Sequence, residues 1–155
     1  MPMTLRDELR QGKPFRSLRE EALLNIARTE AVTREAMERV LAPHGLGMSQ
    51  YNVLRILRGA GTDGLCRNEI RDRLISRMPD VSRLLDRMEA AGLISRVRST
   101  EDRRLVTTTL TKKGRALVDK LDDEVADAQK ALLGHMSQEQ LRALVELLSE
   151  ARSPN

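Results

Sequence analysis

The sequence of 155 residues has almost no aromatic side chains and a single cysteine. It contains no Trp, one Phe (Phe15) and one Tyr (Tyr51). A chain of this length can bury a sizeable single core, and that core must be aliphatic. Because Cys66 has no second thiol to pair with, a disulfide within the chain is excluded, as expected for a protein of the reducing cytoplasm.

Long apolar runs and recognisable catalytic motifs are missing too. No stretch approaches the roughly 20 apolar residues that span a bilayer, and the opening MPMTLRDELRQGKPF alternates charge instead of forming a signal peptide. Two His and one Cys provide no zinc-ligand spacing. The chain has no Gly-rich phosphate loop and no nucleophile elbow. We therefore expect no membrane segment, no metal or other cofactor and no enzymatic activity.

Charge is abundant and unevenly distributed. Charged residues make up 32% of the chain, which has a net charge of +4 and an isoelectric point near 9.7. From Arg55 to Arg104 there are twelve arginines, no lysine and eight acidic residues, so this segment carries an excess equal to that of the whole chain. The planar fork of Arg suits phosphates and guanine edges. A general preference for Arg over Lys would also produce this bias.

Apolar spacings of three and four residues predict a mainly helical chain. Pro43 and Gly45 end the first helix. Ser49 and Thr111 are expected to cap later helices, and Ser137 with Gln140 forms a capping box for the last. The predicted helices span about 16–42, 50–59, 67–73, 78–91, 112–134 and 138–151.

The period changes to that of strands after Gly92. Residues 94–98 and 105–110 are rich in β-branched side chains and are joined by a wholly polar loop at 99–104. Short helices, a tight turn and a hairpin together predict a winged helix-turn-helix lobe at about 48–111. Residues 16–155 form one domain in this interpretation, and residues 1–15 form a mobile or partner-bound arm, because Gly12 and Pro14 interrupt any regular pattern.

The predicted helix at 78–91 has two faces of different chemistry. Val81, Leu84, Leu85 and Met88 form an apolar stripe. The opposite side offers short polar groups and forked arginines, which suit the edges of bases in a major groove. An ordinary amphipathic surface helix is the alternative. The residues on or beside the polar face are Pro79, Asp80, Ser82, Arg83, Asp86 and Arg87.

Acidic residues on this helix would repel phosphates unless they are paired. Asp80 can pair with Arg83 or Arg87, or can accept a hydrogen bond from a cytosine amino group.

The hairpin carries adjacent arginines at its tip. Arg103 and Arg104 on a narrow ribbon suit a minor groove with concentrated negative potential. Arg96 and Arg98 on the approaching strand are expected to meet phosphates, and Asp102 to orient a neighbouring Arg. A solvated turn is the alternative, but a helix-turn-helix followed directly by a basic hairpin favours DNA binding.

These segments resemble the MarR family of bacterial transcriptional regulators, in order and spacing, over about residues 18–148. The resemblance lies in a second-helix opening, a recognition helix with the turn into the wing, and a wing pattern of Asp-x-Arg, a β-branched strand and Leu-Thr followed by Gly114. In this sequence they are MSQYNVLRIL at 48–57, PDVSRLLDRMEAAGLI at 79–94 and DRRLVTTTLT at 102–111.

The resemblance implies a homodimer on a pseudo-palindromic duplex, with dimerisation helices at about 16–43 and 112–151. Recognition helices would enter successive major grooves, acting in a repressor released by a small effector. By position, Pro79, Asp80, Ser82, Arg83 and Arg87 would face bases or nearby phosphates, and Arg103 and Arg104 would be wing-tip contacts. Ser49 and Gln50, at a helix start, are candidates for a phosphate contact.

Many MarR-type repressors respond to a phenolic or other lipophilic ligand bound between the dimer helices and the DNA-binding lobe. The few aromatic residues here argue against a stacking pocket. His44 and Tyr51 are the candidates near that junction. Alternatively, His44 caps a helix end near the negative pole of its dipole and Tyr51 simply packs.

Two other functions stay open at this point. Cys66 precedes a short helix and is followed by Arg67, an arrangement that can favour a thiolate and thus thiol-based redox sensing. A buried, inert cysteine is the alternative. The second open function is that of a helical adaptor that binds protein through its winged module. The wing arginines argue against this function.

Overall fold

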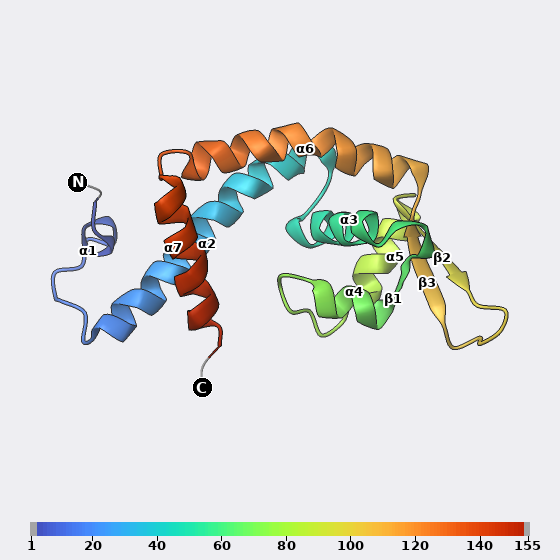
Figure 1. Ribbon diagram of the computed structural model, residues 1–155, viewed down its shortest axis with the longest axis horizontal. Coiled ribbons are helices and arrows are strands. Elements are labelled where there is room, and N and C mark those ends of the chain that lie inside the picture. Colours follow the sequence, from blue (N-terminus) through green and yellow to red (C-terminus); the bar gives the residue numbers. More distant parts are fainter. Residues whose placement is uncertain (1–2, 154–155) are drawn as a thin grey trace.

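The computed structural model describes residues 3–153, so the ends of the predicted arm and domain, residues 1–2 and 154–155, lie outside it. Most of the described part is helical, with one small antiparallel sheet (Figure 1). In chain order the elements are α1 Leu5–Glu8, α2 Leu18–Leu41, a 3₁₀ turn Ala42–His44, α3 Met48–Ala60, a 3₁₀ turn Gly61–Asp63, β1 Leu65–Cys66, α4 Arg67–Arg73, α5 Ser82–Ala90, β2 Ile94–Arg98, β3 Val106–Leu110, α6 Lys112–Leu133 and α7 Gln138–Ala151.

The sheet has the strand order β1-β3-β2. Strands β2 and β3 form the predicted hairpin, with Ile94 opposite Leu110 and Arg98 opposite Val106. The two-residue β1, which the sequence did not predict, pairs with β3 and joins the hairpin to the helix-turn-helix. The predicted mainly α fold with a hairpin wing is therefore confirmed.

One aliphatic core fills the lobe and extends to α6. Its fully buried side chains include Leu54 and Leu57 of α3, Leu85 and Met88 of α5, and Leu121 of α6. Tyr51 is the one aromatic member, and it is 6% exposed. Since α6 lies on both the lobe and α2, it connects the winged helix-turn-helix lobe to the long helices (Figure 1).

Capping explains most helix boundaries. The hydroxyl of Thr111 accepts a hydrogen bond from the backbone N–H of Gly114 at 3.0 Å and donates one to the carbonyl of Gly92 at 2.6 Å. Ser137 and Gln140 form the predicted capping box. The start of α3 differs, because Gly47 occupies the cap position in place of Ser49, and its N–H donates to Gln50 Oε1 at 3.0 Å.

Gly114 lies where α6 leaves the hairpin. A methyl group built on it would overlap the carbonyl of Leu93, so only glycine lets α6 approach the α5–β2 turn this closely. This close approach gives a physical reason for a glycine after the wing.

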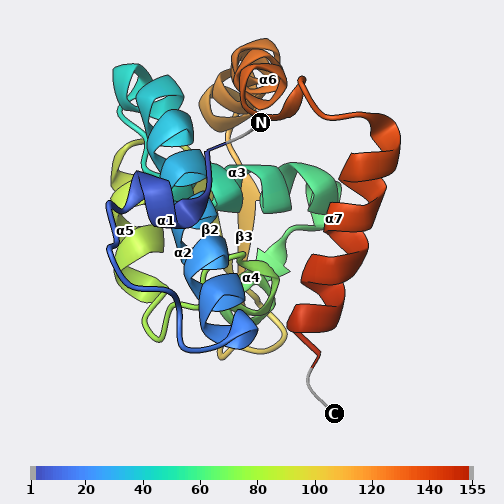
Figure 2. The same ribbon diagram turned by 90° about the vertical axis from the view of Figure 1, so that its left-hand side faces the viewer.

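Within the predicted arm, the described residues 3–15 include a short helix, α1, that the sequence patterns did not predict. Helix α1 is capped by Thr4, and its Leu5 is 5% exposed. Glu8 pairs with Arg28 of α2 at 3.1 Å, which holds the arm along that helix (Figure 2).

Helices α2 and α7 leave apolar side chains in solvent. None of the described residues of α7 is buried, and Val145 and Leu147 are more than 60% exposed. On α2, Leu18 and Leu23 are also strongly exposed, together with Leu24, Ile26 and Val32 to a lesser degree. Among residues 3–153, no helix combines the length and the apolar character that crossing a membrane requires.

Candidate nucleic-acid interface

Helices α4 and α5 form the helix-turn-helix, and α5 begins later than predicted. The predicted helix at 78–91 is observed only at Ser82–Ala90. Pro79 disfavours a helical conformation at the preceding residue, and Asp80 Oδ1 accepts a hydrogen bond from the N–H of Ser82 at 2.9 Å. Pro79 and Asp80 therefore lie in the turn immediately before the helix.

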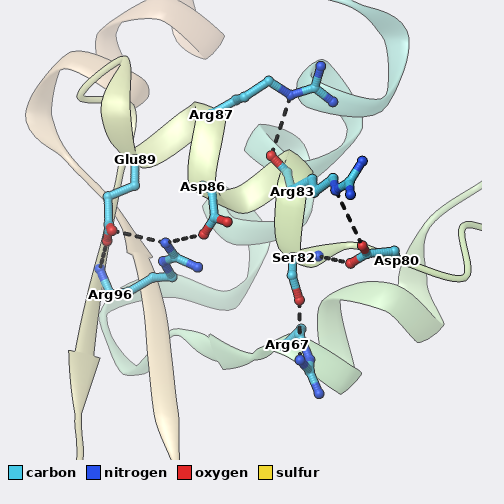
Figure 3. Close-up of polar contacts among 8 residues, drawn as sticks. All are labelled: Arg67, Asp80, Ser82, Arg83, Asp86, Arg87, Glu89 and Arg96. Atoms are coloured by element: carbon cyan, nitrogen blue, oxygen red, sulfur yellow. Dashed lines mark hydrogen bonds and ion pairs between the residues drawn. The ribbon is translucent and has the colours of Figure 1, made fainter.

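The two predicted faces of α5 are confirmed. Val81, Leu84, Leu85 and Met88 are at most 3% exposed. The side chain of Arg83 is 88% exposed, and its Nε lies 4.0 Å from Asp80 Oδ2, so the predicted pairing of Asp80 is with Arg83 and is weak. Arg87 is also exposed, and its Nε donates to the carbonyl of Arg83 at 3.4 Å (Figure 3).

Ser82 is held by Arg67, which the sequence patterns did not predict as a DNA contact. Arg67, at the start of α4, donates from Nη1 to Ser82 Oγ at 3.2 Å (Figure 3). Arg67 and Arg71 line a small depression together with Pro79, Asp80 and Ser82. The arginine-only charge of the segment was the available signal, but the contact between the two helices depends on their packing.

Arg96 was predicted to contact a phosphate, but its guanidinium is hydrogen-bonded to acidic side chains of α5. Its Nη2 donates to Asp86 Oδ1 at 2.6 Å and to Glu89 Oε1 at 3.0 Å, both on α5. Its backbone N–H donates to Glu89 Oε2 at 3.0 Å (Figure 3). Hydrogen bonding to Arg96 holds the pKa of Glu89 below its usual value of 4.5, and the same bonds raise the pKa of Arg96.

The wing tip is organised by backbone hydrogen bonds. Asp102 Oδ1 accepts from the N–H of Arg104 at 3.0 Å, so Asp102 orients the backbone of that Arg and not its guanidinium. Arg98 Nη1 donates to the carbonyl of Arg103 at 3.1 Å. Both tip arginines are exposed.

Some of the predicted contacts line two clefts. A cleft of about 310 Å³ between α4, α5 and the wing is lined by Arg67, Ser82 and Arg104, so the tip arginine that faces the helix-turn-helix is Arg104. A second, of about 630 Å³, is lined by Ser49, Gln50 and Arg87 between α2, α3 and α5.

The two candidate effector residues, His44 and Tyr51, do not line the same cavity. Tyr51 lines a cavity of about 540 Å³ between α2, α3 and α6. His44 is not among the lining residues, because its Nε2 lies 3.0 Å from Glu124 Oε2 and joins the 3₁₀ turn to α6. The cavity is lined by Thr33, Met37, Met48, Tyr51, Asn52, Arg55, Ile56, Ile75, Val125, Gln129, Leu132 and Leu133.

Cys66 is half-buried at the start of α4 and lines the cleft that contains Arg67 and Arg104. Its backbone N–H donates to Glu69 Oε2 at 2.8 Å, which places a carboxylate beside it. In the part of the chain that the structure describes, no cluster of three or more His, Cys, Asp or Glu residues could hold a metal ion.

Comparison with known proteins points to transcriptional regulators. A family model described as the transcriptional regulator SarA/Rot matches residues 36–121, more than half of the chain. A MarR transcription factor from Planctomyces limnophilus is 35% identical and superimposes with a TM-score of 0.69, covering 88% of this chain and 98% of its own.

Two further proteins are similar over most of their length. The transcriptional repressor CouR, solved bound to a 23-mer DNA duplex, is 30% identical with a TM-score of 0.71, covering 83% of this chain and 90% of its own. The homoprotocatechuate degradative operon repressor of Escherichia coli is 29% identical over 111 residues, which are 72% of this chain and 74% of its own.

Proposed function

This chain is a DNA-binding transcriptional regulator of the MarR family, and we propose that it acts as a homodimeric repressor on a pseudo-palindromic operator. Repressors are among its relatives, and one of them, CouR, was solved on duplex DNA. The strongest support within the chain is the exposed polar face of α5, beside which Ser82, Arg67 and the wing residue Arg104 line one cleft.

In the proposed complex, α5 enters the major groove and the wing lies over the adjacent minor groove. Pro79, Asp80, Ser82, Arg83 and Arg87 face bases or nearby phosphates. Arg98, Arg103 and Arg104 contact the backbone or the minor groove, with Asp102 shaping the tip, and Ser49 and Gln50 approach a phosphate near the start of α3. Two recognition helices about one helical turn apart would then read the two half-sites.

The proposed dimer is supported by the uncovered apolar residues of α2 and α7. An exposed apolar surface of this kind is typical of a subunit interface. Leu23→Glu should convert the dimer to a monomer in sedimentation analysis. Ile75→Glu changes a side chain of the lobe that is 86% exposed and should leave the dimer intact. A monomeric wild-type protein would refute the dimer.

Selection of bound duplexes from random DNA tests the operator. We expect enrichment of one sequence with two related half-sites whose centres lie about 10 base pairs apart, and two protomers per duplex. Enrichment of a single half-site bound by one protomer would contradict the dimeric mechanism, and no enrichment at all would contradict sequence-specific binding.

We further propose a lipophilic or phenolic effector in the cavity that Tyr51 lines. The cavity is largely apolar and lies between the dimerisation helices and the lobe. Its polar lining residues are Thr33, Tyr51, Asn52, Arg55 and Gln129. Homoprotocatechuate, the phenolic compound in the name of one relative, is the first probe, followed by simple phenols and phenolic acids. Binding should raise the melting temperature and release the selected duplex.

Val125→Trp, which would fill the cavity, should abolish both the rise in melting temperature and the release of the duplex. Cys66→Ser is the control, because Cys66 lines another cleft, and this variant should retain both effects. The absence of any shift with the whole panel would refute a phenolic effector. As a regulator, the protein would act beside the DNA in the cytoplasm, and its proposed activity is binding without catalysis or a metal cofactor.

A further inference from the structure

We propose that Arg96 is a positioning residue, which holds the wing against the recognition helix and offsets part of the negative charge of two carboxylates of that helix, and that it does not bind a phosphate. This inference rests on the proposed DNA binding. Its structural basis is a cluster of three side chains from two elements, Arg96 of β2 with Asp86 and Glu89 of α5 (Figure 3). We call this cluster the wing clasp.

Arg96 donates its hydrogen bonds to the carboxylates of α5. One nitrogen, Nη2, hydrogen-bonds to both carboxylates, and the backbone N–H of the same residue bonds to the second oxygen of Glu89. The side chain of Arg96 is 24% exposed, against 62% for Asp86 and 41% for Glu89. The arginine is thus the most enclosed member of the cluster, while the carboxylates are more exposed on the recognition helix.

The charges of the wing clasp matter because of where it lies. Asp86 and Glu89 follow Arg83 along the helix that we place in the major groove, where uncompensated carboxylates would oppose the DNA backbone. Pairing with Arg96 cancels part of that repulsion. A guanidinium that is already bonded to two carboxylates is a poor phosphate ligand, because binding a phosphate would leave those carboxylates unpaired.

The wing clasp also controls geometry. The wing extends beyond α5 as a two-stranded ribbon, and the seven residue-to-residue steps from Ile94 to Glu101 span roughly 23 Å at about 3.3 Å per step. A rotation of about 10° at its base would move the tip by about 4 Å, enough to remove Arg104 from its contact. Both anchoring groups of Arg96 bond to Glu89, so that residue holds the base in place.

The test is a mutant cycle measured on the selected duplex. Arg96→Gln should lower affinity by about tenfold or more when the carboxylates are present, but by less than about threefold in an Asp86→Asn/Glu89→Gln background, as expected for coupled residues. Arg98→Gln is the matched control, because Arg98 bonds to the wing carbonyl of Arg103. Its effect should be equal in both backgrounds.

Equal losses for Arg96→Gln in both backgrounds would overturn the proposal and assign Arg96 to a phosphate. A second measurement needs no DNA. Glu89→Gln should accelerate hydrogen exchange at the Arg96 amide and along β2, and unchanged exchange would also overturn it. If the wild-type protein binds no duplex, the proposed function fails by itself, while hydrogen exchange still decides whether Arg96 holds the wing.

Discussion

Separate replacement of Arg83 and Arg104 should distinguish the reading of bases by Arg83 from the neutralisation of backbone charge by Arg104. The side chain of Arg83 is 88% exposed and has only a 4.0 Å contact with Asp80, so Arg83→Ala should cost the folded protein little. An arginine that reads guanine supplies about 1–3 kcal/mol of discrimination. A dimer presents two copies, so the change should total about 2–6 kcal/mol, or about 30-fold or more in affinity for the selected site.

Arg104→Ala should act mainly through salt dependence. Each phosphate contact contributes about 0.9 to the slope of log affinity against log salt, so two copies contribute about 1.8. The loss caused by the substitution should therefore shrink by about 12-fold between about 50 and 200 mM salt. Its effect on the choice of base pairs should be small.

Fluorescence anisotropy with the selected duplex and its single-base-pair variants, at four salt concentrations, measures both quantities. Arg39→Ala provides the control, because Arg39 is an exposed arginine of α2 outside the lobe; it should change neither affinity nor slope. If Arg83→Ala selects the same site with wild-type affinity, the assignment of base reading to α5 is wrong. An unchanged salt slope for Arg104→Ala would refute its contact with the backbone.

Two further predictions concern the folded protein. Gly114→Ala should lower the free energy of unfolding by about 1–3 kcal/mol, because its methyl group would overlap the carbonyl of Leu93; Gly59→Ala has open space and should stabilise α3 by about 0.5–1 kcal/mol. Thermal or urea unfolding measures both, and equal effects would contradict the packing at Gly114. Arg58 hydrogen-bonds to Asp122 at 2.8 and 2.9 Å, which holds the pKa of that carboxyl below its usual 3.8. A lowered pKa stabilises the fold above pH 3.8, and this contribution is lost as the pH falls through the lowered pKa. The stability difference between wild type and Arg58→Gln should accordingly shrink below pH 3.8, and a difference independent of pH would refute the ion pair.

The sequence alone determined the architecture, because local signals and the global fold agree in this chain. Apolar stripes with the period of a helix placed α2, α6 and α7 within two residues of their observed bounds. The stripe from Val81 to Met88 identified the buried face of α5, and the change of period after Gly92 identified the hairpin. These features depend on residues close together in the chain, whose periodicity is set by backbone geometry.

What only the tertiary structure decided is which partner each charged side chain has. Arg96 and Arg98 are equivalent in sequence, but packing of the hairpin on α5 brings Asp86 and Glu89 to Arg96, while Arg98 bonds within the wing. His44 was similarly separated from Tyr51 by a contact with Glu124, 80 residues away. Long polar side chains lie at surfaces where several partners compete, and the choice between them depends on distances of a few ångströms that no local pattern encodes.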